Sequence, residues 1–154
     1  MGHWNPTPYE QRTDIEKIQS QWRKIGGFLQ RTDWSAAVVR AATATEIAVN
    51  LAIREEFSNR SEFDAEFVNG LLKWANGLTG KVRNLLLPVL RGKPTYDEVS
   101  ELCGLAKAIN DRRNDIAHRG EFCNEPEALD LIEKCRTFVL GLVRLYKPDL
   151  RWRL

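Results

Sequence analysis

Three polar side chains that lie close together in the sequence have the types and spacing needed to act on a phosphodiester. Arg113 and Asn114 are adjacent, and His118 follows four residues after Asn114. Histidine exchanges protons near neutral pH, and arginine binds phosphate oxygens and offsets the charge that builds up in a transition state. Asn114 can hydrogen-bond the imidazole or the phosphate. Because RNA carries its own nucleophile, the 2′-hydroxyl, such a set could cleave RNA without a metal ion.

A long amphipathic helix is needed to position these residues. The pattern starts after Thr95, where Glu98 three residues later predicts a capping box, and it ends at Gly120. Apolar side chains recur between these ends at helical spacing: Val99, Leu102, Cys103, Leu105, Ala106, Ile109, Ile116 and Ala117. The sequence therefore predicts one helix that carries the three polar residues on its last turns.

A charge interrupts the packing face of this helix. On a helical wheel Arg113 falls inside the apolar stripe, near Ala106. Asn110, Asn114 and His118 form a polar row beside the stripe, at positions i, i+4 and i+8. A sequence that needed only a packed core would not place an arginine there, and a local rule broken in this way tends to mark function.

The order of these residues resembles the signature of the HEPN superfamily. In that signature, arginine is followed by Asn, Asp or His and then, after three further residues, by histidine. Residues 113–118 read Arg-Asn-Asp-Ile-Ala-His and fit this pattern. The order of the helices and the presence of Glu46 give weaker support. Many HEPN proteins are small helical ribonucleases that need no metal.

The resemblance implies a metal-independent endoribonuclease without a cofactor. His118 would be the acid or base, Arg113 the phosphate clamp and Asn114 the third member of the catalytic set. HEPN ribonucleases usually bring two motifs together across a two-fold interface, so a chain with one motif implies a homodimer with a composite site. By analogy the biological role is that of a toxin or phage-defence effector, with RNA as substrate and an antitoxin or other regulatory protein as partner.

Other interpretations of the motif stay open. Many HEPN domains are catalytically inactive, so the alternative is a helical module for dimerisation or for binding a partner or nucleotide. His118 could simply be a cation favoured at a helix C-terminus, and Arg113 could form a structural ion pair with Glu46. HEPN toxins that pair with minimal nucleotidyltransferases often carry tyrosine two residues after the histidine. This chain has Gly120 there, so control by adenylylation is not expected.

Four further residues are candidates for supporting roles. Glu46 falls on the flank of the apolar face of a predicted alanine-rich helix. A carboxylate there either reaches solvent or pairs with Arg112 or Arg113, and we expect the pairing. Arg112 lies at the edge of the apolar stripe and Asn110 belongs to the polar row, so both are assigned to the support of the site. Arg119 is assigned to RNA binding.

Hydrophobic periodicity along the chain predicts an all-α, up-and-down, HEPN-like bundle of about five helices in a single domain, residues 1–154. Residues 1–8 are expected to form an extended arm. Residues 148–154 are expected to be a short frayed tail, with docking on a partner chain or on RNA as the alternative. The apolar segment 78–90 continues the third helix after a kink or forms a helix of its own. The expected helices cover 9–26, 33–57, 64–75 with 78–90, the stretch between Thr95 and Gly120, and 126–147.

Composition narrows the class of protein. The formal net charge is only +2, although 15 of the 23 basic side chains are arginine, the better planar partner for phosphate. No run approaches the roughly 20 apolar residues of a membrane span, and the N-terminus has no signal-peptide pattern. These features predict a cytoplasmic protein without a membrane partner. Cys103, Cys123 and Cys135 form no C-x-x-C pair and have no histidine at zinc spacing, so no metal site is predicted.

Overall fold

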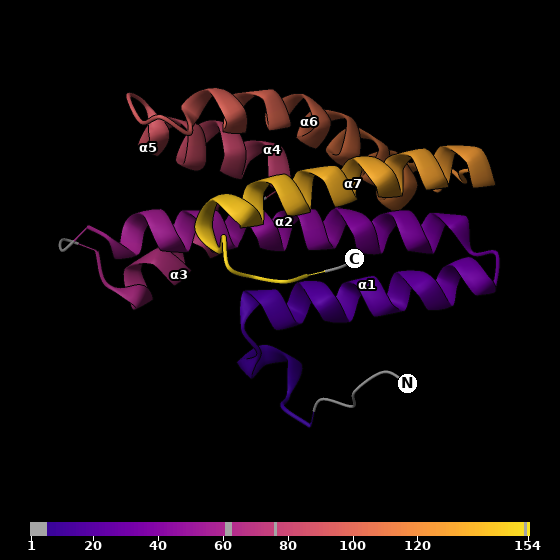
Figure 1. The fold of residues 1–154 in the computed structure, drawn as a ribbon. Coiled ribbons are helices and arrows are strands. Elements are labelled where there is room, and N and C mark those ends of the chain that lie inside the picture. The colour runs from indigo at the N-terminus through magenta and orange to yellow at the C-terminus, as the bar shows by residue number, and fades with distance from the viewer. Residues whose placement is uncertain (1–5, 61–62, 76, 153) are drawn as a thin grey trace.

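The protein is a bundle in which long helices surround one central helix (Figure 1). The computed structural model describes residues 6–60, 63–75, 77–152 and 154, and these residues contain no strand. The helices that pack most extensively on one another are α1 (Asp14–Gln30), α2 (Trp34–Ser58) and α7 (Glu125–Tyr146). The prediction of an all-α helical bundle is confirmed.

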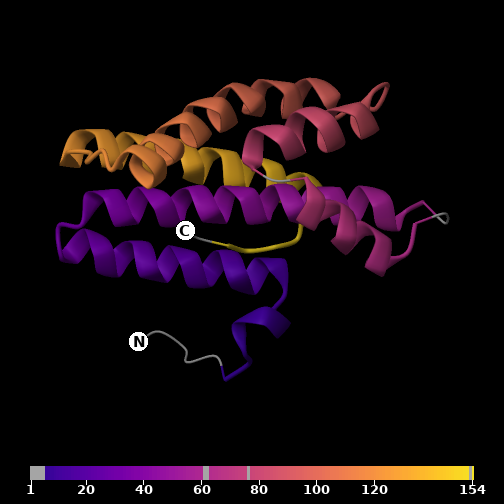
Figure 2. The same ribbon diagram turned by 180° about the vertical axis from the view of Figure 1, so that it is seen from behind.

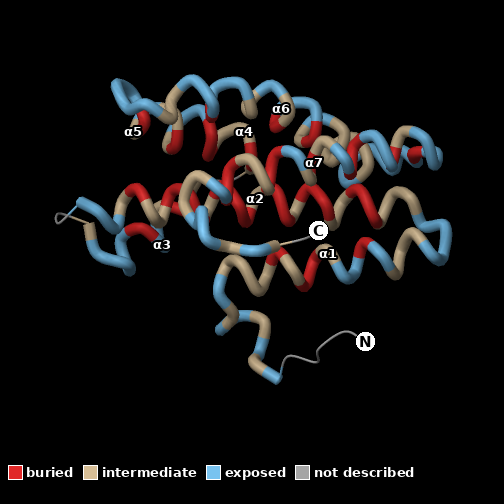
Figure 3. Tube along the Cα trace, in the orientation of Figure 1, coloured by how far each residue is buried: buried red, intermediate tan, exposed pale blue. Residues whose placement is uncertain are grey.

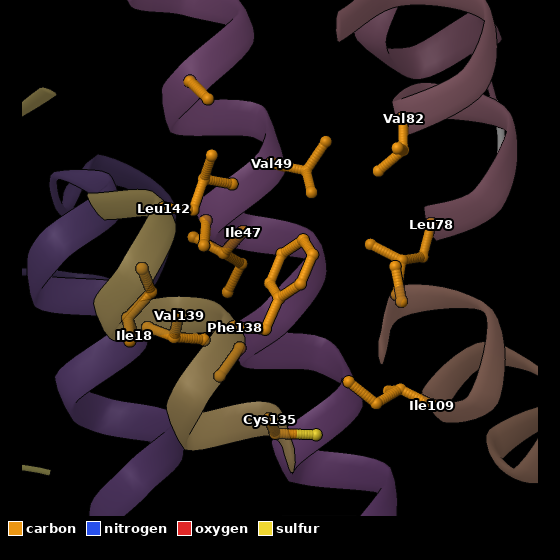
Figure 4. Packing of buried hydrophobic residues seen from close by; sticks show 14 of the residues in the cluster. Ile18, Ile47, Val49, Leu78, Val82, Ile109, Cys135, Phe138, Val139 and Leu142 are labelled. Atoms are coloured by element: carbon orange, nitrogen blue, oxygen red, sulfur yellow. The ribbon is translucent and has the colours of Figure 1, made fainter. Parts of the chain in front are cut away.

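Helix α2 is the centre of the bundle because its small side chains let neighbouring helices approach closely. Helices α1 and α7 make their most extensive contacts with it, and Figure 3 shows buried positions along most of its length. Figure 4 shows side chains from α1, α2, α7 and the helices across from them meeting in one core, with Phe138 near its middle. Seven of the residues buried in α2 are alanine or threonine: Ala37, Ala41, Ala42, Ala44, Thr45, Ala48 and Ala52.

The composition of α2 has a second consequence. Its 25 residues include an 18-residue window with a mean hydropathy of 1.4, so by length and composition alone the helix could cross a membrane. The expectation that no segment approaches a membrane span was therefore too strict. In the fold, 61% of that window is buried among the other helices, as in the core helix of a soluble bundle.

The first helical segment differs from its predicted limits at both ends. A short 3-10 turn, η1 (Tyr9–Gln11), precedes α1, which starts after Thr13 with a capping box to Glu16. The helix does not stop at the two glycines near residue 26 and ends at Gln30 instead. A glycine inside a helix costs about 1 kcal/mol relative to alanine, and the packing of α1 on α2 offsets this cost.

The middle of the chain contains more helical segments than expected. Helix α3 (Ala65–Trp74) is followed by Gly77, whose φ of 84° separates it from the next apolar segment. That segment is a helix of its own, built from α4 (Leu78–Lys81), the five-residue π-helical turn η2 (Val82–Leu86) and α5 (Leu87–Leu90). It packs against the first half of the helix that carries the motif.

The motif helix, α6 (Tyr96–Arg119), has the predicted limits, but its N-terminus lacks the predicted capping box. Thr95 at its N-cap has helical backbone angles, and its side chain makes no capping hydrogen bond, so the capping box was wrong. The C-terminus ends as predicted at Gly120, which adopts a left-handed φ of 65°. Asn124 then caps α7 by accepting a hydrogen bond from the Glu127 amide.

The C-terminal tail is packed and not frayed. After α7 the chain turns back along the bundle toward α1 (Figures 1 and 2). Leu150, Trp152 and Leu154 pack against the main hydrophobic core. The Arg136 Nε donates a hydrogen bond to the Leu154 carbonyl at 3.1 Å. The tail is therefore part of the domain, and the expected fraying was wrong.

Candidate functional site at the end of helix α6

The three motif residues lie on the last turns of α6 and differ in exposure. Arg113 and Asn114 are half-buried, whereas His118 is exposed to solvent. The Arg113 Nη1 lies 3.4 Å from the Asn114 Oδ1, a long hydrogen bond between neighbouring side chains. Asn110, one turn before Asn114, is also half-buried. The helix thus places the polar row as the sequence predicted.

Arg113 lies between two separate hydrophobic clusters. Ile109, one turn before it, is 1% exposed and belongs to the main core. Ile116, nearly one turn after it, packs on a smaller cluster that includes Val38 and Leu131. Within the described residues no carboxylate lies within ion-pair distance of the Arg113 guanidinium. A half-buried cation without an anion is a ready partner for a negatively charged ligand.

Arg112, the neighbouring arginine, forms ion pairs with two carboxylates. Its Nη1 lies 2.5 Å from the Glu121 Oε2, and its Nε lies 2.5 Å from the Glu127 Oε1. Its Nη2 donates a hydrogen bond to the Phe122 carbonyl at 3.1 Å. Burial alone would lower the pKa of the Arg112 guanidinium, but Glu121 and Glu127 outweigh burial and raise it. Arg112 therefore ties the end of α6 to the loop and to the start of α7.

The loop after α6 is held from both sides. Arg112 binds one face of it, and on the other the Cys123 amide donates a hydrogen bond to the Ser35 Oγ at 3.2 Å. Phe122, between these anchors, is 88% exposed. The sequence interpretation gave Phe122 no role. A lone aromatic residue after a helix-ending glycine is a weak signal, although it is the only apolar side chain between Gly120 and Cys123.

Glu46 does not belong to the motif. Its Oε1 lies 2.8 Å from the Nζ of Lys81 on α4, and Lys81 is only 5% exposed. The expected ion pair with Arg112 or Arg113 was wrong, as was the structural interpretation of Arg113 as a partner of Glu46. Position 46 of α2 faces α4 and not the end of α6. The sequence signal that was overlooked is Lys81 itself, three residues after the buried Leu78 on an apolar helix.

Arg119 is at the surface in a loose ion pair. Its Nη1 lies 3.5 Å from the Asp115 Oδ1 one turn earlier, and its side chain is 72% exposed. Such i, i+4 pairs contribute little and are readily exchanged for another anion. Arg119 therefore remains available to an anion, and its assignment to RNA binding stays a prediction.

His118 is not sealed by neighbouring side chains. It lies in the last turn of α6, where the helix dipole favours a cation, so a structural role is compatible with its position. Its exposure also leaves it free to reach a ligand or a second protein chain. Among the described residues, no group of three or more His, Cys, Asp or Glu side chains gathers as a metal site would require.

Comparisons of the chain with protein-family profiles, with curated proteins and with solved structures gave no match. The resemblance to the HEPN superfamily therefore stays a prediction from residues 113–118.

Proposed function

We propose that the protein is a metal-independent endoribonuclease of HEPN type whose active site is completed by a second copy of the chain. One observation carries the proposal. His118 is exposed on the same two turns of α6 where Arg113, half-buried, has no acidic partner in the described structure. The adjacent Arg112 shows the contrast, because two glutamates already neutralise it.

The proposed reaction uses the 2′-hydroxyl of the substrate as nucleophile. One His118 removes the proton of that hydroxyl, and the new bond from the 2′-oxygen to phosphorus forms as the bond to the 5′-oxygen breaks. The departing 5′-oxygen takes a proton from the His118 of the second copy, and the products are a 2′,3′-cyclic phosphate and a 5′-hydroxyl. Arg113 binds the non-bridging oxygens, and Asn114 helps to orient its guanidinium.

The biological part of the proposal rests on the family likeness alone. On that likeness the protein acts in the cytoplasm as a toxin or phage-defence effector, and an antitoxin or other regulatory protein is its partner. No membrane takes part in this proposal. The burial of most of the apolar window of α2 within the bundle supports that view.

A second candidate function has its own support. The end of α6 is rich in carboxylates, with Asp111, Asp115, Glu121, Glu125 and Glu127 within 17 residues of sequence. Such a surface repels RNA unless the arginines dominate locally. This charge balance favours an inactive helical module that dimerises or binds a partner or a nucleotide at the same place.

Substitution at the motif tests the proposal. His118→Ala should lower RNA cleavage by about 10²–10⁴-fold without changing the melting temperature, because His118 is exposed and acts only in proton transfer. Arg113→Ala should weaken both RNA binding and cleavage, whereas the matched control Arg91→Ala, an exposed arginine before α6, should leave both unchanged. Equal activity in all three variants would assign the cleavage to another site or a contaminant.

Dilution tests the shared site. If two copies complete one site, the specific activity should fall steeply once the protein concentration drops below the dissociation constant of the dimer. A specific activity that stays constant across that range would contradict a composite site.

A further inference from the structure

Helix α3 has two apolar faces, and the bundle covers only one of them. Val68 and Leu72 are 4% and 5% exposed and point into the core. Phe67, Leu71 and Trp74 recur at positions i, i+4 and i+7 and form a second stripe on another face of the helix. Phe67 is 50% exposed and Trp74 is 81% exposed. An apolar stripe of this kind on a short surface helix indicates a contact with another molecule.

One end of the stripe, at Phe67, is already held in place by other aromatic side chains. The ring of Phe67 stacks on that of Phe63 at 5.1 Å, and Phe63 meets Phe57 of α2 edge-on at 5.3 Å. An open hollow of about 500 Å³ runs along the helix here and is lined by Asp64, Glu66, Phe67, Gly70, Leu71 and Trp74. A preformed aromatic surface loses little side-chain freedom when it is covered. Figures 1 and 2 show α3 beside the C-terminal end of α2, away from the end of α6.

Two opposite charges flank the stripe on one side. Glu66 and Lys73 are seven residues apart, so they lie two turns apart on nearly the same face of α3. Both are exposed, and neither has an ion-pair partner within the described parts of the chain. Gly70 lies between them, and a Cβ added there would meet no atom within 4 Å. The edge of the stripe between the two charges therefore carries no side chain.

We propose that this stripe is a two-fold contact with a second copy of the chain, in which the two α3 helices lie antiparallel and cross at Gly70. A two-fold axis that pairs Glu66 with Lys73 of the second copy also brings Phe67 and Trp74 of the two copies to within two residues of register. Both pairs are centred within one residue of Gly70. Every contact then occurs twice, as a self-complementary interface requires.

The small residue at the axis fits this arrangement. With no side chain at Gly70, the two helices approach closely, and Leu71 of each copy lies over the Gly70 backbone of the other. The charged flanks face each other on one side, as equivalent flanks do in an antiparallel helix pair. Opposite charges placed in this way fix the direction of the pairing more than they add to its strength.

The surface area of the proposed α3 contact is small, so the dimer is expected to be weak. One face of a ten-residue helix buries less than the roughly 1,200 Å² of total surface found at the low end of specific interfaces. The dimer should therefore be weak and reversible, and detectable at tens to hundreds of micromolar protein. The α3 contact does not depend on the proposed ribonuclease. If both contacts form, two different two-fold interfaces build a closed tetramer or a longer chain.

Charge exchange tests the pairing directly. Sedimentation velocity of the full chain over about 1–500 µM protein should show reversible association. Glu66→Lys and Lys73→Glu should each weaken it several-fold, because each places like charges opposite each other twice. The double variant Glu66→Lys/Lys73→Glu should restore it. Trp74→Ser should weaken it about tenfold or more without lowering the melting temperature, since Trp74 is exposed.

A cysteine at the axis gives a second readout. Gly70→Cys has room for its side chain and should form a disulfide-linked dimer under mild oxidation. Ser100→Cys, exposed on α6, is the matched control and should remain uncrosslinked, as should the wild-type chain with its native thiols.

Three results would overturn the proposal. The wild-type chain could stay monomeric over the whole concentration range. The three single variants at Glu66, Lys73 and Trp74 could associate like the wild type. The double charge variant could fail to regain association. If the stripe instead receives a different protein or a membrane, self-association will be insensitive to these changes. RNA cleavage is measured separately, so loss of the α3 contact and failure of the ribonuclease proposal give different results.

Discussion

The Nζ of Lys81 lies 2.8 Å from the Oε1 of Glu46, inside the contact between α4 and α2. The side chain of Lys81 is only 6% exposed, and that of Glu46 is 32% exposed. A buried ammonium requires a counter-charge, so Glu46 serves the core and not the motif. The pair anchors the segment 78–90 on the central helix, and that segment in turn supports the first half of α6.

Loss of the Glu46 carboxylate should destabilise the protein without changing the proposed RNA cleavage. We expect Glu46→Ala to lower the free energy of unfolding by about 2–4 kcal/mol, because Lys81 is left buried without a partner. Lys81→Met should cost less, since the chain then replaces a charge with an apolar side chain of similar length. Urea denaturation measures both effects. A larger loss in Lys81→Met than in Glu46→Ala would show that the packing of Lys81 matters more than its charge.

The ion pairs of Arg112 with Glu121 and Glu127 lead to a second prediction. Arg112→Ala should lower the free energy of unfolding by about 1–3 kcal/mol, because Glu121 and Glu127 lose their shared partner and the Phe122 carbonyl loses a donor. Arg112→Lys should recover only part of this loss, since an ammonium cannot bind both carboxylates in the same fixed fork. Hydrogen exchange should show faster opening of residues 120–124 in both variants. Unchanged exchange in the loop would contradict the role of Arg112.

The prediction of the fold from sequence succeeded where hydrophobic periodicity was long and uninterrupted. The limits of α2, α6 and α7 were found to within about a residue, and Gly120 and Asp33 mark helix ends in the structure. Errors arose where long-range packing overrode a local signal. The glycines near residue 26 do not break α1 because its apolar face continues along α2. The tail packs because Trp152 and two leucines contact the main hydrophobic core. The local composition of the tail does not predict this contact.

The candidate site was predicted in part. The spacing of Arg113, Asn114 and His118 on one helix followed from the 3.6-residue period alone. Glu46 was misassigned because a helical wheel gives the direction of a side chain and not the neighbour that it meets. The sequence also did not predict that Arg112 forms ion pairs while Arg113 forms none in the described structure. This difference depends on where the loop places Glu121 and Glu127.

A buried thiol predicts a specific pH dependence of stability. Burial raises the pKa of the Cys135 thiol from its ordinary value of 9.0 to about 12, and a hydrogen bond with Thr45 lowers it by a smaller amount. The folded state therefore holds this proton more tightly than the unfolded state. The resulting stability is fully present below pH 9 and is lost as the pH rises from 9 to 12. Burial and the nearby Glu56 raise the pKa of Tyr146 as well, which adds to the loss at alkaline pH.

The measurement is the free energy of unfolding between pH 8 and pH 12 in urea. In Cys135→Ala the free energy of unfolding should fall less between pH 9 and pH 12 than it does in the wild type. This comparison of slopes holds even if the cavity left by the substitution lowers the stability at pH 8. Cys103, which is half-buried, should react with a thiol reagent at pH 8 before Cys135, which is 1% exposed. Parallel pH profiles for Cys135→Ala and the wild type would refute the linkage.

Mapping of RNA ends in the presence of a chelator tests the central claim most directly. Purified protein is incubated with total RNA and excess EDTA, and the new termini are identified chemically. The account predicts cleavage that survives EDTA, fragments with 2′,3′-cyclic phosphate and 5′-hydroxyl ends, and loss of these ends in His118→Ala. A well-folded protein that cuts no RNA, or one that cuts only with magnesium and leaves 3′-hydroxyl ends, would contradict the proposed roles of Arg113 and His118.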